Sequence, residues 1–295
     1  MVVSLASEVL WQYRRFTLYN SPFAAHDRGC AVDLYPEGDG APSPVAGEVL
    51  DTRRVRAPPK PYAAEHDYLL LVDTGAHVAR ILHVDPAVEP GDSVAVGDPL
   101  GELVRAGFFA PWVPNHIHLG FRPPEENPYR ASGSLPLSPG VDPRPLSWDG
   151  TGTVVERGET WARLDAPTHP APGEAFVGLE SNGAVLDGGF PHYDQGGLLG
   201  RPVREGDRTD GTGGRGDGVT AGDGRVVSLA DTQVATATKR TVTWDDCTVR
   251  ANGDPVRGIA LFCARDSFGI KLVGESVDLA VGQSVTVSVD RSARD

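Results

Sequence analysis

The chain carries short runs of apolar residues, many of them β-branched, and turn-forming residues separate one run from the next. Runs with the 3.6-residue period of an amphipathic helix are scarce, whereas alternation with a period of two recurs. The segment "QSVTVSV" is an example, because Val285, Val287 and Val289 alternate with polar residues as in a half-buried strand. The pattern therefore predicts an all-β fold.

The first part of the chain predicts a β-rich domain over residues 1–125, in which polar turns rich in Gly and Pro separate the apolar runs. The expected strands lie within 7–20, 30–36, 43–55, 67–74, 77–84, 92–104 and 116–121.

A Pro- and Gly-rich stretch over 126–150 is expected to connect this domain to a second β-rich region over 151–295. In that region Asn182-Gly183 and Asn252-Gly253 each separate two apolar runs. Both dipeptides predict type I′ hairpin turns, because Asn and Gly accept the positive φ that these turns require. The segment 204–225 is rich in Gly and Asp and is typical of a flexible loop.

Charge excludes two classes of partner. The sequence holds 40 acidic against 27 basic residues and has a formal net charge of −13 at pH 7. Such a charge repels nucleic acid and anionic membrane surfaces, so we expect neither as a partner.

The first residues place Glu8 within an apolar segment and lack the basic region of a signal peptide. No apolar run is long enough to span a bilayer, so a cytoplasmic location is expected. The oligomeric state is not predicted.

The three cysteines lack the close spacing of zinc-binding motifs. We expect reduced, partly buried thiols, and a bridge between Cys247 and Cys263 stays an alternative.

Candidate chemistry begins with the stretch "PNHIHLGFR", where His116 and His118 lie one residue apart. On a strand these two side chains share one face, while Ile117 and Leu119 share the other. Imidazole is the commonest metal ligand, but a lone His-x-His pair needs partners. His26, Asp33 and His83 lie in or beside other expected strands of the same domain.

These pieces resemble the lysostaphin-type zinc metalloendopeptidases. The resemblance rests on the order of a His and an Asp near the start, then "SPVAGEV", then "ILHVDPAVEPGDSVAVGDPLGEL" and finally "HIHLGF", over about residues 20–122. It implies a β-sandwich or barrel-like domain built from a duplicated β motif, and an enzyme that hydrolyses a peptide bond in a peptide or peptide-containing substrate. In the wall-lytic relatives that peptide contains Gly or Ala.

The resemblance also implies the role of each residue. His26, Asp33 and His118 would bind zinc, with His116 as the general base and His83 as an orienting or oxyanion-stabilising group. Zinc would increase the acidity of water, and a neutral imidazole would accept its proton.

The sequence departs from the family in two places. Six residues separate His26 from Asp33 where the family has three, so an extra loop must fold away, and Asp27 is an alternative carboxylate ligand. The small residues that usually precede the His-x-His are replaced by "RAGFFAPWVPN". Its aromatic residues would either line the approach to the site or cover the open end of the sheet: Phe108, Phe109 and Trp112.

Two other functions share the motif pattern. In a phosphotransferase-type carrier domain His83 would be phosphorylated, and in a lipoyl- or biotinyl-type carrier a lysine such as Lys60 would be modified. A metal-binding interaction module without catalysis is the third possibility. The cluster "FPHYDQGG" around His192 is also noted, as a candidate substrate-side loop from the second region.

Overall fold

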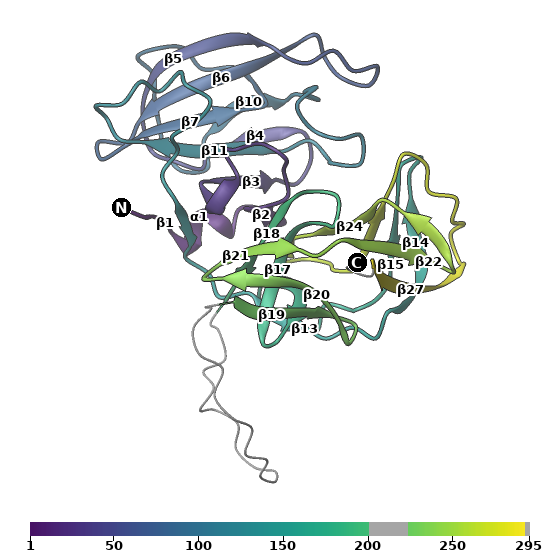
Figure 1. Ribbon diagram of the computed structural model, residues 1–295. Helices are drawn as coiled ribbons and strands as arrows, with labels where there is room; N and C mark the ends of the chain where they lie inside the picture. The colour runs from purple at the N-terminus through teal and green to yellow at the C-terminus, as the bar shows by residue number, and fades with distance from the viewer. Residues whose placement is uncertain (201–223, 293–295) are drawn as a thin grey trace, which may run out of the picture.

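The computed structural model describes residues 1–200 and 224–292. Within these ranges the chain forms 27 strands, the four-residue helix α1 (Ser7–Leu10) and the 3-10 helix η1 (Asp27–Gly29). The predicted all-β class is confirmed. The N-terminal strands form the upper part of the molecule in Figure 1, and the C-terminal strands form the lower part. Most of the loop predicted over 204–225 lies outside the described residues. Among the described residues, no helix has the length and apolar character to cross a bilayer.

The N-terminal strands form one large antiparallel sheet and one small sheet. The large sheet has the order β9–β5–β6–β7–β11–β3–β2. Its strands are β2 (Arg15–Thr17), β3 (Ala31–Tyr35), β5 (Gly47–Arg56), β6 (His66–Asp73), β7 (Val78–Leu82), β9 (Ser93–Val94) and β11 (Ile117–Arg122). The small sheet has the order β4–β10–β8 and contains β4 (Gly40–Pro42), β8 (Val84–Pro86) and β10 (Pro99–Leu103). Strand β1 (Val3–Leu5) pairs in parallel with β12 (Leu137–Pro139).

The alternation of side chains decides which face of the large sheet is buried in the core. On β11, Ile117 and Leu119 enter the N-terminal core, and on β3 Val32 and Leu34 do the same. The residue between each pair therefore points to the opposite face. The small sheet closes the core from the other side through Ala41, Val84 and Leu100. As a result Asp33 and His118 lie together on the outer face of the large sheet.

The strand predicted over 7–20 is wrong in its first half. Residues Ser7–Leu10 form α1, and only Arg15–Thr17 form strand β2. The buried side chains of α1, Val9 and Leu10, pack into the N-terminal core. The apolar run was too short for its period to distinguish this turn from a strand.

The C-terminal half is also built mainly from antiparallel strand pairs. Its strands are β13 (Arg144–Leu146), β14 (Thr151–Arg157), β15 (Trp161–Leu164), β16 (Val177–Ser181), β17 (Ala184–Phe190), β18 (Gln195–Leu199), β19 (Gly224–Leu229), β20 (Thr232–Thr238), β21 (Thr241–Trp244), β22 (Cys247–Ala251), β23 (Asp254–Val256), β24 (Gly258–Leu261), β25 (Cys263–Ala264), β26 (Lys271–Val273) and β27 (Ser284–Arg291).

Both predicted hairpins are confirmed. Asn182 and Gly183, with φ of 50° and 79°, connect β16 to β17, and Asn252 and Gly253, with φ of 52° and 90°, connect β22 to β23. Strand β27 shows the predicted alternation, with Val285 and Val287 buried. Cys247 and Cys263 form no disulfide, so the alternative bridge is wrong.

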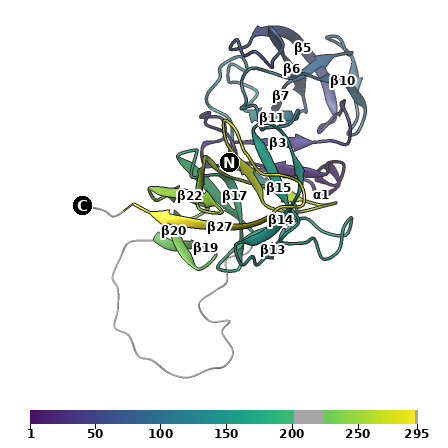
Figure 2. The same cartoon turned by 90° about the vertical axis from the view of Figure 1, so that its right-hand side faces the viewer.

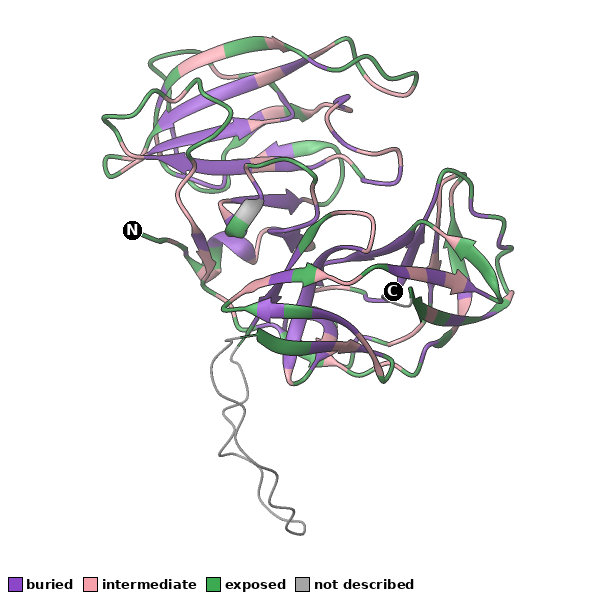
Figure 3. Cartoon of the chain, in the orientation of Figure 1, coloured by how far each residue is buried: buried purple, intermediate pink, exposed green. Residues whose placement is uncertain are grey.

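Strand β2 joins the two halves of the molecule. It pairs with β3 on one edge and with β25 on the other, so hydrogen-bonded strands run from the N-terminal into the C-terminal half. In Figure 2, β3 lies at the border of the N-terminal part that faces the C-terminal strands. The C-terminal residues Phe176, Val185, Leu199 and Cys263 belong to the N-terminal core. The Phe176 ring lies 5.4 Å from the Trp11 ring and 5.0 Å from the Phe16 ring, measured between centroids. Figure 3 shows the resulting continuity of buried residues between the halves.

A second link between the halves is the buried carboxylate of Asp187 on β17. It accepts hydrogen bonds from the hydroxyl of Thr17 and, at 2.6 Å, from the backbone N–H of Leu18. Burial raises the pKa of Asp187 to about 6. The side chain therefore ties β17 to the end of β2 but is costly to ionise.

We expect Phe176→Ala to destabilise the whole chain by about 3–5 kcal/mol, because the substitution leaves a cavity where the two halves meet. Urea unfolding followed by both fluorescence and circular dichroism should give one transition shifted to lower urea. Val281→Ala, at a side chain 61% exposed, is the control and should change the free energy of unfolding by less than about 0.5 kcal/mol. A Phe176→Ala protein as stable as the control would contradict the shared core.

Asp187 predicts a pH dependence of stability. Because its folded pKa lies above its unfolded value, its contribution is complete below about pH 4 and is lost as the pH rises through about 6, by up to about 3 kcal/mol. Asp187→Asn lacks this dependence. The free energy of unfolding of the wild type, minus that of the variant, should therefore fall between pH 4 and pH 7. Parallel curves for the two proteins would disprove the prediction, since their other titrating groups are the same.

Candidate metal centre

The structure brings the three predicted metal ligands together. Asp33 on β3 and His118 on β11 are directly opposite each other in the antiparallel pairing of these strands. His26 comes from the segment before η1 and reaches the same point on the outer face of the sheet. The extra residues between His26 and Asp33 are taken up by η1, where Arg28 and Gly29 adopt φ of 59° and 66°. The side chain of Asp27, the alternative ligand, lies outside what the structure describes.

Three atoms of these residues form a small triangle. The Nε2 atom of His26 lies 3.1 Å from Nδ1 of His118 and 3.3 Å from Oδ1 of Asp33. Nδ1 of His118 and Oδ1 of Asp33 are 3.0 Å apart. Zinc binds such atoms at about 2.0–2.1 Å in a tetrahedron, whose edges are then about 3.3 Å long. The triangle therefore has close to the size of one face of a zinc coordination sphere.

Hydrogen bonds hold two of the imidazole rings by their Nδ1 atoms. His26 donates from Nδ1 to the carbonyl of Leu18 at 2.8 Å, and His116 donates from Nδ1 to the carbonyl of Pro114 at 2.8 Å. Each ring therefore keeps the lone pair of Nε2. Partners of this kind orient ligands around metal sites, because they fix both the tautomer and the ring plane. In His116 the Nε2 atom lies 3.6 Å from Oδ2 of Asp33 and so faces the same centre.

His83 lies beside these rings but outside the triangle. Its ring centroid is 5.0 Å from that of His116 and 5.8 Å from that of His118. The residue interrupts the strand predicted over 77–84, because its φ of 70° separates β7 from β8. Such a conformation is uncommon for a residue other than glycine, and residues that hold it often lie at functional sites.

The partner of His83 is Asp67, a residue that sequence reasoning missed. Asp67 is completely buried, and its Oδ2 accepts a hydrogen bond of 2.6 Å from Nδ1 of His83. The signal was present in "HDYLLLVD", where Asp67 has the same alternation as Leu69 and so points to the outer face. Only the register of β6 against β7, which pairs Leu69 with Leu82, places Asp67 next to His83.

Burial and charge divide the site into one anion and several imidazoles. Burial by itself would raise the pKa of Asp33, but His26 and His116 outweigh it and hold the pKa well below its ordinary value. Burial likewise lowers the pKa of His26, yet the Asp33 carboxylate raises it above the ordinary value. Burial lowers the pKa of His116 and of His118 to about 4. Near pH 7 the site thus contains a carboxylate and two neutral rings.

The centre lies in a cleft of about 470 Å³. Phe108 and Phe109 line this cleft, and the Phe109 ring packs 4.6 Å from His116, so these two residues form part of the approach. Trp112 is buried, and the centre of its ring lies 5.7 Å from the centre of the His192 ring. Tyr193 of the predicted "FPHYDQGG" loop also lines the cleft. The further lining residues that the sequence did not indicate include Asn20, Val55, Leu69, Arg80, Leu82 and Tyr129.

Three other histidines, His66, His77 and His169, have partners away from the centre. His66 is bonded to Arg54 at 2.8 Å, and His169 is bonded to the carbonyl of Ala175 at 3.1 Å. The His77 ring packs 6.1 Å from Phe121. None of the three lines the cleft.

Comparison with protein families gives two adjacent matches. Residues 4–139 match the N-terminal domain, and residues 144–290 the C-terminal domain, of a family described as a domain of unknown function, DUF8155. The interval between the matches lies between β12 and β13. A comparison with curated proteins gave no match. Because the two models together match nearly the whole chain, the protein belongs to the DUF8155 family and contains both of its domains.

Proposed function

We propose that the protein is a zinc-dependent peptidase that hydrolyses a peptide bond in a peptide or peptide-containing substrate. The observation that most supports this function is the triangle of His26 Nε2, Asp33 Oδ1 and His118 Nδ1, with two more histidines beside it in a cleft. Two imidazoles and one carboxylate are a donor set of catalytic zinc sites, which keep one position open.

The donor atoms of His26, Asp33 and His118 fit zinc because they converge on one point of the cleft. They lie within 3.3 Å of one another and share protons in hydrogen bonds and an ion pair, and a zinc ion would take the place of those protons. Zinc held there would act as a Lewis acid that polarises a carbonyl and increases the acidity of water. His26, Asp33 and His118 would bind it.

The two remaining histidines have the positions needed for proton transfer and charge stabilisation. His116 presents Nε2 toward Asp33, since its Nδ1 is held by Pro114, and would accept a proton from water during attack on the carbonyl. His83 is held by Asp67 and would orient the substrate carbonyl or stabilise the oxyanion that develops on it.

The cleft favours a substrate with an apolar group beside the scissile bond. Its walls include Phe23, Phe108, Phe109 and Leu82, and apolar side chains bind such surfaces by leaving water. The resemblance to wall-lytic peptidases suggests Gly or Ala in the substrate.

A carrier function has less support. A phosphorylated histidine must be reached by a partner protein, but His83 is 5% exposed and its Nδ1 is bonded to Asp67. Lys60, the candidate for a modified lysine, is exposed in a segment with no paired strand and does not line the cleft.

The metal itself is testable by elemental mass spectrometry. We expect about one zinc per chain after reconstitution and dialysis, and loss of nearly all of it in Asp33→Ala, because the only anionic ligand is removed. Asp85→Ala, an exposed aspartate on β8, is the control and should retain zinc. Equal zinc content in all three proteins would show that this triangle is not the metal site.

The division of roles within the histidine pair is tested by comparing His116→Gln with His118→Ala. His116→Gln should retain zinc and lose about 10²–10⁴-fold in peptide hydrolysis, since a general base is removed. His118→Ala should lose both metal and activity. Hydrolysis is followed with a quenched fluorescent peptide library, with His66→Gln as the control. If the wild type binds zinc but cleaves no peptide, the protein is a metal-binding module and not a peptidase. Equal zinc loss in the two variants would contradict the assigned roles.

A further inference from the structure

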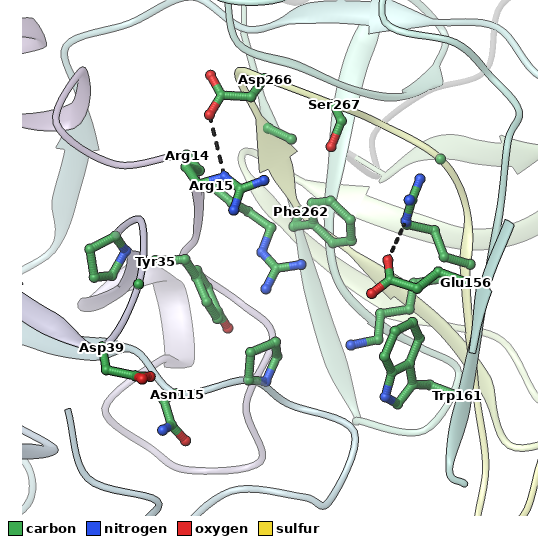
Figure 4. Close-up of a pocket in the computed structure, with 17 residues that line it drawn as sticks. Arg14, Arg15, Tyr35, Asp39, Asn115, Glu156, Trp161, Phe262, Asp266 and Ser267 are labelled. Atoms are coloured by element: carbon green, nitrogen blue, oxygen red, sulfur yellow. Dashed lines mark hydrogen bonds and ion pairs between the residues drawn. The ribbon is translucent and has the colours of Figure 1, made fainter. Parts of the chain in front are cut away.

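A second cavity, of about 520 Å³, lies where the two domains meet. It combines Arg14, Arg15 and Tyr35 of the N-terminal domain with Trp161, Phe262 and Lys271 of the C-terminal domain. Figure 4 shows Arg15 between Tyr35 and Phe262, with Trp161 on the opposite wall. The cavity therefore presents cationic groups among aromatic rings, in a chain whose net charge is −13.

The guanidinium of Arg15 is held in place without a carboxylate. Its Cζ atom lies 4.0 Å from the centre of the Tyr35 ring and 4.6 Å from the centre of the Phe262 ring. Within the described ranges, no acidic side chain forms an ion pair with it. Stacking between two rings fixes the plane of the guanidinium, while its N–H groups at the edge stay available to an acceptor.

Lys271 is a second cation of this kind. The residue is only 6% exposed, and its Nζ atom donates to the carbonyl of Trp112 at 2.5 Å and lies 4.6 Å from the centre of the Trp161 ring. No carboxylate of the described chain pairs with it. Burial, with Arg15 nearby, lowers its pKa well below the ordinary value. A buried ammonium without a counterion is costly, and an anion beside it would offset that cost.

Three acidic side chains of the described residues line the cavity, and two of them pair with other cations. Asp266 pairs with Arg14 at 3.4 Å, and Glu156 pairs with Arg163 at 3.1 Å. Both pairs are partly exposed, and the dashed lines in Figure 4 mark them. The third acidic residue, Asp39, lies on the Tyr35 side of the cavity in that view, away from Phe262 and Trp161. Arg15 and Lys271 are thus the cations that an incoming anion could meet, and Trp161 and Phe262 offer apolar surface beside them.

We propose that this cavity binds a small organic anion. Its carboxylate or phosphate group contacts Arg15 and Lys271, and its apolar part packs against Trp161 and Phe262. Arginine and lysine are the side chains that recognise both oxyanions, and charge-assisted hydrogen bonds to them are the stronger kind. Since Arg15 comes from one domain and Lys271 from the other, the site exists only in the two-domain protein.

The test is isothermal titration of the full chain with three anions: benzoate, phenyl phosphate and inorganic phosphate. We expect saturable binding of one ligand per chain by benzoate or phenyl phosphate, and weaker binding of inorganic phosphate because it lacks the apolar part. Whichever of the two aromatic anions binds more tightly identifies the oxyanion. Binding of none at about 10 mM, a concentration at which even millimolar affinity saturates the site, would overturn the proposal.

Variants then locate the site. Arg15→Gln and Lys271→Met should each weaken binding by about 10-fold or more, because each removes one charge-assisted contact. Arg250→Gln, at a side chain that is 37% exposed, pairs with Asp290 and does not line the cavity, is the matched control and should bind as the wild type does. Unfolding curves check that each variant is folded. Unchanged affinity in both test variants would overturn the proposal.

The site is independent of the metal centre. Asp33→Ala should bind the aromatic anion with unchanged affinity, whether or not the wild type holds zinc or cleaves peptides. Loss of anion binding in Asp33→Ala, with Arg15→Gln unaffected, would place the anion at the metal centre and contradict the proposal.

Discussion

The pairing of β3 with β11 is the interaction on which the candidate site depends. The two strands are antiparallel neighbours in register, so Asp33 and His118 lie side by side, while Val32, Leu34, Ile117 and Leu119 bury the opposite face. Because side chains alternate with a strict period of two, a slip of one residue would turn the ligands toward the core. The burial of these four apolar residues therefore also holds the ligands in position.

The cost of burying polar groups explains the arrangement around this pair. Asp33, His26, His83 and His116 are each at most 5% exposed, so each must have a partner. The carbonyls of Leu18 and Pro114 and the carboxylate of Asp67 supply those partners. These bonds leave the remaining nitrogen atoms directed at the cleft, which keeps the histidines ready to bind a cation or a substrate without rearrangement.

The C-terminal domain takes part in the structure of the N-terminal site. Strand β2 pairs with β25, Phe176 packs into the N-terminal core, and Asp187 binds the backbone of Leu18. The carbonyl of that same Leu18 holds His26. On the other side of the cleft, Lys271 binds the carbonyl of Trp112, in the segment that leads to His116. Each contact connects the second domain to residues that position the candidate ligands.

Much of this could be predicted from the sequence, and the physical reason is local. Period-two alternation specified the all-β class, and the Asn-Gly dipeptides specified two hairpins, because both depend on neighbouring residues alone. The same alternation indicated that His116 and His118 share a face. The resemblance supplied the selection of His26, Asp33 and His83, which lie far apart in the chain.

Other features depend on contacts between distant segments, and only the tertiary structure decided them. Residues 7–10 form a helical turn, and its side chains Val9 and Leu10 are buried in the N-terminal core. The register of β6 and β7 places Asp67 next to His83. The contact between the two domains brings Arg15 and Lys271 into the same cavity. The sequence by itself determined the all-β class, most of the strands and the residue types of the site. Strand pairing and domain packing determined which of those residues lie in contact, because neither leaves a local pattern.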